Sequence, residues 1–580
     1  MRQKIEALRA WKGSGKLGLA LMLLCPLFVV LMTEINQKGS FAIVGTLFTQ
    51  TPSIVLFDFL FVSVIFYFIL LLCKNAFISG TITGLAMYIL SCVEFYRYKA
   101  SGAHFTMGDF SLFTNVGDVA KFAGIQIYPM LVVMLLLLAL YLTAMFIFNV
   151  KFTLKWKQVI PSCSTILAGM VAFFIVPSVS NSVFDVFGVN HRGPSNNFVL
   201  EEKFEDNGMI AFLVENITDT IDTTNIKTPE NYSPQSIQTM AVDLKEATPK
   251  VKPNVIMIMS ESYTDFRIMN NALGISDDYY TNMDKLSEEG YRGTAFVPTF
   301  GGYTVKTEFE LLFGLPIKAL NGTQAPQSLI GEGEQTTIAS YYKSQGYSTS
   351  YMHPYTREFY DRGELYPRYG FDNCYFQEEI TGADFRKYRD DGAVFDKAIE
   401  QIKADENPSY IHITTMQNHM PYNLNPDQTQ LDYYMDGIKN TDVRMGELME
   451  KLKNLDEPTV VMMVGDHFPF FTEENSAYDR LGINAQNCQE LYEKAYFIWS
   501  NYELDYNTIN DQTVSTFYLP YVLIDLIGLP ENEIVGVMNE QMKIDPIYTM
   551  EYDEDSRNET LDTLTYDLIL GDKYTNDYLK

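Results

Sequence analysis

Five long apolar runs in the first third of the chain constrain its fold more than any other feature. They cover about residues 17–35, 53–73, 77–96, 128–149 and 158–178. Crossing the hydrocarbon core of a bilayer as a helix takes roughly 20 apolar residues, and each run is about that long. One such run could be a signal peptide or a buried core helix, but five in succession predict a membrane domain over residues 1–178.

Basic residues flank these runs unevenly. The opening stretch, MRQKIEALRAWKGSGK, is rich in Lys and Arg, and the loop between the fourth and fifth runs carries Lys151, Lys155 and Lys157. Cytoplasmic loops of membrane proteins are enriched in Lys and Arg. We therefore expect a multi-pass membrane protein with its N-terminus in the cytoplasm. After five crossings, everything beyond about residue 179 is expected outside the cell.

The chain after the fifth apolar run is acidic, and its pattern is typical of a soluble α/β domain. The net charge of the protein is −29, and the acidic excess follows the fifth apolar run, which argues against nucleic-acid binding. Residues 179–250 are polar and predict a connector. In residues 251–580 short apolar strands alternate with helical stretches such as 392–404 and 438–453. This alternation predicts a mostly parallel sheet covered on both faces.

Polar side chains follow each of four predicted strands, which are NVIMIM (254–259), YSTSYM (347–352), SYIHIT (409–414) and TVVMMV (459–464). The residues that follow them are Glu261, then His353 and Arg362, then His419, then Asp466 and His467. Ligands of open α/β sheets bind beyond the carboxyl ends of the strands, so these side chains are expected at one edge. Three of the six histidines of the chain lie in these four loops.

Glu261, Asp466 and His467 offer two carboxylates and an imidazole. This mixture suits one divalent cation such as Mn²⁺, Mg²⁺ or Zn²⁺, with a coordination position left for a nucleophile. Thr304 follows the glycine pair of GGYTVKTEFE and precedes a helical pattern, and its hydroxyl is our candidate nucleophile. His353, Arg362 and His419 would then bind or protonate a phosphate group.

The sequence leaves plainer interpretations open for each of these residues. Thr304 could simply cap the helix, because helix starts favour small hydroxyl residues. Ser260, Ser262 and Thr307 are rival hydroxyls, although Thr307 lies inside the predicted helix, where it tends to bond back to the backbone. Cys374 and Cys488 could form a disulfide, and no CxxC pair is present to suggest a thiolate zinc site.

The motifs SESYTDF, FGGYTVKTEFELLFGLP, NHMPY and GDH occur in an order that resembles the lipoteichoic acid synthase family of Gram-positive bacteria. That family lies within the alkaline phosphatase and sulfatase superfamily. The resemblance covers nearly the whole chain, and it implies five spans, a connector and an extracellular sulfatase-like domain. Two departures stand out. Tyr360 replaces a tryptophan common beside the family's arginine, and the threonine motif reads GYTVKTEF in place of GKTS followed by an acidic stretch.

The resemblance also implies roles for individual residues. Glu261, Thr304, Asp466 and His467 would bind one divalent ion, usually manganese, and Thr304 would be the nucleophile. Substrate-contacting residues of the family match His353, Tyr360, Arg362 and His419.

Carried over from the family, the expected reaction moves glycerophosphate from phosphatidylglycerol to Thr304 and then to a glycolipid or a growing teichoic-acid-like polymer. Alternatives are a phosphoethanolamine transferase and a transferase that decorates a wall polysaccharide with single glycerophosphates. A sulfatase is less consistent with the chain, because no Cys/Ser-x-Pro-x-Arg motif surrounds Thr304. A degenerate sensor or scaffold would have lost one of the four metal positions, and all four are filled.

Overall fold

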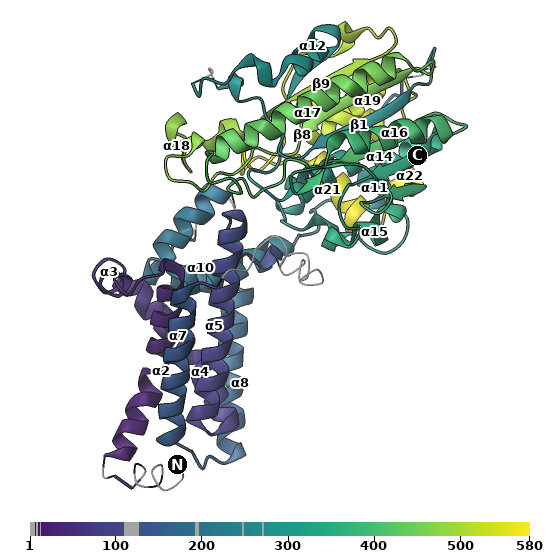
Figure 1. Ribbon diagram of the computed structural model, residues 1–580. Coiled ribbons are helices and arrows are strands. Elements are labelled where there is room, and N and C mark those ends of the chain that lie inside the picture. Colours follow the sequence, from purple (N-terminus) through teal and green to yellow (C-terminus); the bar gives the residue numbers. More distant parts are fainter. Residues whose placement is uncertain are drawn as a thin grey trace. The chain divides into compact units, whose positions relative to one another are not determined.

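The computed structural model describes residues 6, 8, 10–11, 13–109, 127–191, 196–245, 247, 249–269 and 272–579. Within these residues the chain divides into two compact units, with the boundary between Asp222 and Thr223 (Figure 1). Unit 1 is the N-terminal, helical part and unit 2 is the C-terminal, α/β part.

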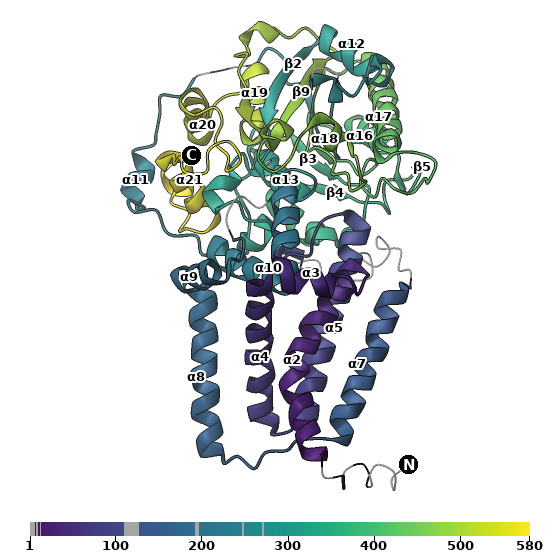
Figure 2. The same ribbon diagram turned by 90° about the vertical axis from the view of Figure 1, so that its left-hand side faces the viewer.

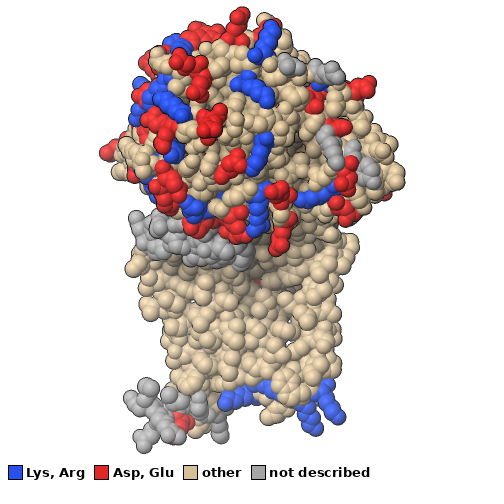
Figure 3. Space-filling view, turned by 90° about the vertical axis from the view of Figure 1, so that its right-hand side faces the viewer, with Lys and Arg blue, Asp and Glu red and all other residues tan. Residues whose placement is uncertain are grey.

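Unit 1 contains five helices that are long and apolar enough to cross a membrane. They are α2 (Ser14–Lys38), α4 (Pro52–Cys73), α5 (Ala76–Ser101), α7 (Pro129–Ile147) and α8 (Trp156–Ile175). Each coincides with one of the five apolar runs, which confirms the predicted five-helix membrane domain. Figure 3 shows a belt with almost no charged side chain along this unit, with Lys and Arg gathered at one end. Such a belt is the surface that lipid tails require.

Helices also occupy much of the stretch expected to be a polar connector. In this stretch α9 (Pro177–Phe187) and α10 (Asn197–Thr224) follow the fifth span. A further short helix, α3 (Ile43–Gln50), lies earlier in the chain and precedes α4. Helix α10 contains many polar residues and so has only a weak apolar pattern, yet it buries Phe204, Met209 and Phe212. A break at Gly208, with φ 67°, divides this helix. Compact unit 1 therefore extends to Asp222 and includes these helices.

Unit 2 is built on one eight-stranded sheet with the strand order β10-β2-β9-β8-β1-β7-β3-β4. The strands are β1 (Asn254–Ser260), β2 (Tyr291–Phe296), β3 (Ser348–Met352), β4 (Asn373–Tyr375), β7 (Ser409–Thr414), β8 (Thr459–Gly465), β9 (Glu493–Ser500) and β10 (Val514–Ser515). The four strands expected from the sequence are the adjacent β8, β1, β7 and β3, which pair in parallel. Only β9 runs antiparallel to its neighbours, so the mostly parallel sheet is confirmed.

Helices cover both faces of this sheet. Figure 2 shows α16 (Asp391–Ala404) and α17 (Gln430–Lys453) on one side of the strands, and α19 (Leu519–Leu526) and α20 (Glu533–Ile544) on the other. Alternate residues of β1, namely Val255, Met257 and Met259, join the large core cluster with Leu311 and Leu523. Because strand side chains alternate between faces, Ile256 and Ile258 fill the opposite side. A sheet buried on both faces explains the nearly continuous apolar strands.

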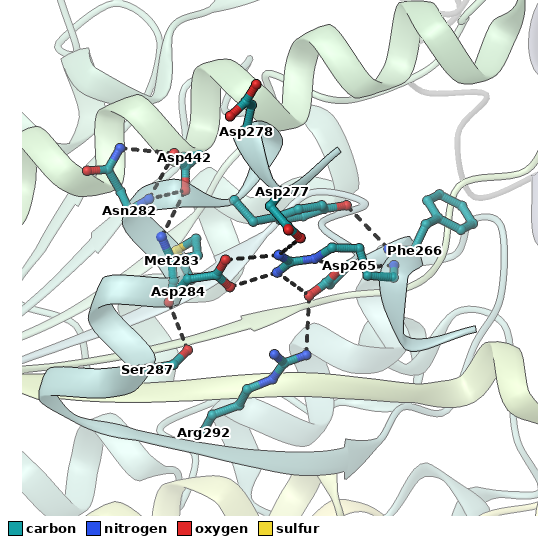
Figure 4. A network of polar contacts seen from close by, with 12 residues as sticks. Asp265, Phe266, Asp277, Asp278, Asn282, Met283, Asp284, Ser287, Arg292 and Asp442 are labelled. Atoms are coloured by element: carbon teal, nitrogen blue, oxygen red, sulfur yellow. Dashed lines mark hydrogen bonds and ion pairs between the residues drawn. The ribbon is translucent and has the colours of Figure 1, made fainter. Parts of the chain in front are cut away.

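An ion network secures the segment that follows β1 (Figure 4). Arg267 pairs with Asp265, Asp277 and Asp284 at 2.7–2.9 Å, and Arg292 also reaches Asp265. Asp284 lies in α12 (Thr281–Glu289), so the network ties the loop after β1 to a helix on the sheet. This loop begins at the carboxyl end of β1, where the candidate site lies.

Candidate active site

Two neighbouring strands deliver the two acids of the site. β1 and β8 pair in parallel, and their register sets Ser260 opposite Gly465 at the carboxyl ends. The next residues along the chain are Glu261 and Asp466, so both carboxylates leave the sheet side by side. They are more than 200 positions apart in sequence, and only the strand order of the sheet makes them neighbours.

Four side chains converge at this edge. A carboxylate oxygen of Glu261, one of Asp466 and a ring nitrogen of His467 lie within 4.8 Å of one another. The Thr304 hydroxyl donates a hydrogen bond to Asp466 Oδ2 at 2.8 Å and lies 3.4 Å from His467 Nε2. The acids and the histidine are buried, whereas Thr304 is half-buried. A hydroxyl with partial access to solvent therefore points into a buried cluster of candidate ligands.

A left-handed turn aims Thr304 at this cluster. Gly301, Gly302 and Tyr303 have φ values of 69°, 154° and 57°, and Thr304 is the first residue of α13 (Thr304–Phe313). Glycine adopts such angles without strain, which explains the glycine pair. The helix N-cap is Tyr303, and no side chain caps it. The Thr304 hydroxyl thus bonds to a site acid instead of capping the helix.

Two of the three rival hydroxyls, those of Thr307 and Ser262, have other partners. Thr307 donates to the backbone carbonyl of Asp466 at 2.8 Å, and Ser262 donates to Glu261 Oε1 at 2.9 Å. The Ser260 hydroxyl is buried without a hydrogen-bond partner among the residues that the structure describes. Of these hydroxyls, only Thr304 bonds to a carboxylate oxygen of Asp466.

Hydrogen bonds to the backbone determine which atoms of His467 and Asp466 face the site. His467 Nδ1 lies 2.8 Å from the Phe468 carbonyl and donates to it, which leaves the Nε2 lone pair free. Asp466 Oδ1 accepts two backbone N–H groups, from Ser262 and His467, which leaves Oδ2 facing the site. A second partner that orients each ligand is typical of protein metal sites.

The charge of the cluster fits a divalent cation. Burial, and then the negative charge of Asp466, raise the pKa of Glu261 well above its usual value. Two buried carboxylates this close are costly without a compensating positive charge. Carboxylate, imidazole and hydroxyl groups are ligands that Mg²⁺, Mn²⁺ and Zn²⁺ accept. The cluster is therefore a possible site for a divalent metal ion.

Lys494 lies beside this cluster and was not expected from the sequence. It projects from β9, is buried, and donates hydrogen bonds to the Thr264 hydroxyl and, at 3.1 Å, to the carbonyl of His467. Burial lowers its pKa well below the usual lysine value. A single lysine inside a strand forms no motif, so no local pattern signals its role.

Arg362 and His353 form a second group of site residues. Arg362, the first residue of α15 (Arg362–Leu365), is 1% exposed, and its Nη1 lies 3.3 Å from His353 Nε2. His353 Nδ1 donates to the Thr414 carbonyl at 2.9 Å. Burial, and then the charge of Arg362, lower the pKa of His353 to about 3, so its imidazole is neutral. His353 Nε2 is thus directed at Arg362 and accepts a hydrogen bond from it.

Tyr360 and His419 complete the expected set. Tyr360 has a φ of 58°, and its ring centre lies 5.1 Å from the Arg362 guanidinium. His419 Nδ1 donates to the Met420 carbonyl at 2.8 Å, and burial lowers its pKa to about 4. His419 lines a pocket together with Lys387, Tyr388 and Tyr422, among other residues. His419 also lies within electrostatic reach of His467, which connects this pocket with the cluster.

Glu308 was also missed by the sequence reasoning, although a signal was available. It lies four residues after Thr304 in α13 and is 1% exposed. Its carboxylate pairs with Arg362 at 2.8 Å. Residues four apart share one face of a helix, so the spacing in TVKTEFE puts this acid on the same face as Thr304.

Comparison with known proteins finds related sequences. Residues 253–529 match the Sulfatase family. The chain is 27% identical over 260 residues to a lipoteichoic acid synthase of Staphylococcus saprophyticus, covering 40% of this chain and 38% of that protein. It is 26% identical over 365 residues to a Rhizobium meliloti protein named for cyclic beta-1,2-glucan modification, covering 58% and 55%.

A solved structure shares the fold of a large part of the chain. The Streptococcus pyogenes phosphoglycerol transferase GacH, in complex with sn-glycerol-1-phosphate, superposes with a TM-score of 0.51 at 20% identity, covering 61% of this chain and 98% of that one. The chain spans about half or less of the length of the curated relatives named above. Five candidate membrane spans thus precede a region that matches the Sulfatase family, in a chain that is similar to the lipoteichoic acid synthases.

Proposed function

We propose that the protein is a phosphoglycerol transferase that uses Thr304 as its nucleophile. The observation that carries this proposal is the direction of the Thr304 hydroxyl, which donates to Asp466 Oδ2 inside the cluster of Glu261, Asp466 and His467. A hydroxyl held against candidate metal ligands at a helix start is suited to attack phosphorus. The names of the relatives, lipoteichoic acid synthase and phosphoglycerol transferase, support the same reaction class.

Glu261, Thr304, Asp466 and His467 are the residues that would hold the cation, for which we favour Mn²⁺. When bound, a divalent cation there supplies positive charge that favours the ionised Thr304 hydroxyl and offsets charge on the phosphate oxygens. The protein's own contribution is to fix the positions of these groups. Arg362, 1% exposed and next to the Tyr360 ring, adds a guanidinium for the phosphate.

The first half of the reaction exchanges one phosphate ester bond for another. Thr304 Oγ1 attacks the phosphorus of phosphatidylglycerol, and the bond from phosphorus to the diacylglycerol oxygen breaks. The hydroxyl proton of Thr304, which is now hydrogen-bonded to Asp466, is transferred to the departing diacylglycerol oxygen. Glycerophosphate remains on the threonine, and no external energy source is needed.

The second half transfers the group to an acceptor hydroxyl. His419 donates from Nδ1 to the Met420 carbonyl and its imidazole is neutral, so we assign it to take the acceptor's proton. The acceptor oxygen then bonds to phosphorus as the bond to Thr304 breaks, and the proton passes on to Thr304 Oγ1, which restores its hydroxyl. The surface around His419 and Tyr422 is our candidate for the side from which the hydroxyl of a glycolipid or a polymer end approaches.

A second candidate differs in the acceptor. The similarity to a protein named for cyclic beta-1,2-glucan modification favours transfer of single groups to a glycan over polymer growth. Both reactions use the same Thr304 intermediate, so product length separates them. A phosphoethanolamine donor would give a different mass on Thr304.

The test uses the full-length protein with labelled phosphatidylglycerol, labelled phosphatidylethanolamine and Mn²⁺. We expect diacylglycerol release from the first lipid and a glycerophosphate mass on the peptide that contains Thr304. Thr304→Ala should lose at least about 10⁴-fold in rate, as removal of a nucleophile does elsewhere. Thr323→Ala, a buried threonine outside the site, is the matched control and should turn over normally. Normal turnover by Thr304→Ala would refute the assignment.

A further inference from the structure

One helix carries both the candidate nucleophile and a second buried acid. Glu308 lies one turn after Thr304 in α13 and is 1% exposed. A buried carboxylate requires partners, because an unpaired charge in the interior is strongly destabilising. The partners of Glu308 therefore indicate what this acid does.

Both oxygens of Glu308 are fully engaged. Oε2 accepts hydrogen bonds from Arg362 Nη2 at 2.8 Å and from Arg362 Nε at 3.2 Å. Oε1 accepts from the Tyr351 and Thr414 hydroxyls, each at 2.7 Å. Tyr351 lies in β3 and Thr414 ends β7, so two strands of the sheet hold the carboxylate in place.

These contacts fix the orientation of Arg362. Two of its five N–H groups bind Glu308, and its Nη1 lies 3.3 Å from His353 Nε2 and 3.4 Å from the Phe359 carbonyl. Within the part of the chain that the structure describes, the second Nη2 hydrogen of Arg362 is not hydrogen-bonded. Aromatic rings of Phe359 and Tyr360 lie 5.7 and 5.1 Å from the guanidinium. The group is held on most sides and keeps one donor for a ligand.

We propose that Glu308 is a positioning residue, which orients Arg362 toward the phosphate that Thr304 attacks. Because α13 carries both Thr304 and Glu308, the nucleophile and the anchor of the arginine belong to one rigid element. The charge of Arg362 reaches the metal cluster, since it acts on Glu261. The identity of the phosphate rests on the proposed function, whereas the pairing of Glu308 with Arg362 does not.

The same helix supplies an internal comparison. Glu310 is fully buried in α13, but its Oε1 accepts a backbone N–H from Ile317 at 3.2 Å rather than a guanidinium. Replacing it by glutamine preserves shape and leaves Arg362 untouched. Glu310→Gln is therefore the matched control for Glu308→Gln, since both replace a buried carboxyl group of α13 by an amide.

The alternative is that Glu308 has a purely structural role and only anchors α13 to the sheet. A double-mutant cycle separates the two roles, because a residue that acts through Arg362 has no further effect once Arg362 is gone. The full-length variants are Glu308→Gln, Arg362→Ala, the double variant and Glu310→Gln. Turnover of phosphatidylglycerol is measured with and without millimolar guanidinium, and unfolding midpoints are recorded in parallel.

We expect Glu308→Gln to lower kcat/KM by on the order of 100-fold, as misplacement of a binding group does. In the Arg362→Ala background the same substitution should change kcat/KM by no more than about twofold. Added guanidinium should restore Arg362→Ala only where Glu308 is present to hold it. Glu308→Asp keeps the charge and should recover part of the loss. It also replaces Glu308→Gln in the cycle if that variant does not fold.

Additive losses in the double variant, or equal guanidinium rescue with and without Glu308, would overturn the proposal. Failure of the proposed function looks different, because wild-type protein would then turn over no phosphatidylglycerol. In that case binding of inorganic phosphate to the Mn²⁺-loaded protein decides the matter. Weaker phosphate binding by Glu308→Gln but not by Glu310→Gln supports the positioning role. Equal binding by both, or no binding by wild type, refutes it.

Discussion

The charge on Glu308 can be tested through the stability of unit 2 as a function of pH. The perturbation is Glu308→Gln, which removes the charge while keeping the size of a side chain that is 1% exposed. Arg362 then loses its carboxylate partner, which it contacts at 2.8 Å. The quantity of interest is the difference in unfolding free energy between wild type and variant at each pH.

The structure sets the magnitude of this difference. Burial alone would raise the pKa of Glu308, but the charge of Arg362 and its hydrogen bonds outweigh burial and lower the pKa from 4.5 to about 2. One pKa unit corresponds to about 1.4 kcal/mol, so the shift amounts to about 3 kcal/mol. Because the folded pKa is the depressed one, this stabilisation is complete above about pH 4.5 and is lost as the pH falls toward 2.

Tryptophan fluorescence offers a suitable assay. The chain has three tryptophans, and Trp499, buried in β9, is the one in unit 2. Replacing Trp11 and Trp156 by phenylalanine leaves a signal from unit 2 alone. Denaturant unfolding of this full-length form, with and without Glu308→Gln, is followed between pH 6 and 3.

The difference in unfolding free energy should stay level above pH 5 and then fall by about 1.4 kcal/mol per pH unit below about 4.5. Carboxylates other than Glu308 titrate in both proteins, so their contributions cancel. A difference that stays constant from pH 6 to 3 would refute the reasoning. It would mean that Glu308 has no depressed pKa in the folded protein.

Three further predictions concern the metal, the ion network and the membrane topology. Mn²⁺ at 100 times its dissociation constant should stabilise wild-type unit 2 by about 2.7 kcal/mol but leave Asp466→Asn unchanged, and a chelator should reverse the shift in unfolding midpoint. Arg267→Met should lower the free energy of unfolding in denaturant by about 2–3 kcal/mol, because Asp265, whose side chain is 4% exposed, loses its main ion-pair partner. The control Lys285→Met, whose ion pairs are exposed, should change stability by less than about 1 kcal/mol. A reporter fused after residue 250 should be extracellular and one inserted near Lys155 cytoplasmic, and the reverse pattern would contradict the orientation.

Several features could be predicted from the sequence because they depend on local patterns. The five spans follow from uninterrupted apolar length, and the four central strands from short apolar runs bounded by polar loops. Loop residues such as Glu261 and His467 were found because parallel strands present their carboxyl ends at one edge. The glycine pair before Thr304 singled out this hydroxyl, and Gly301 and Gly302 have φ values of 69° and 154°.

Other features were hidden because their signals are weak or distant. Strand β9 contains the buried Lys494 and runs antiparallel, so it lacks the pattern of the other central strands. Helix α10 is polar overall and was interpreted as part of a connector, although it buries one side. Cys374 and Cys488, for which a disulfide was considered, are both free thiols.

The sequence by itself determined which segments cross the membrane, which strands form the centre of the sheet and which side chains follow them. Each of these depends on residues close together in the chain. Only the tertiary structure decided that Glu261 and Asp466 are neighbours and that Glu308 holds Arg362. Those contacts join residues tens to hundreds of positions apart, and strand order and helix packing, which bring them together, leave no local pattern in the sequence.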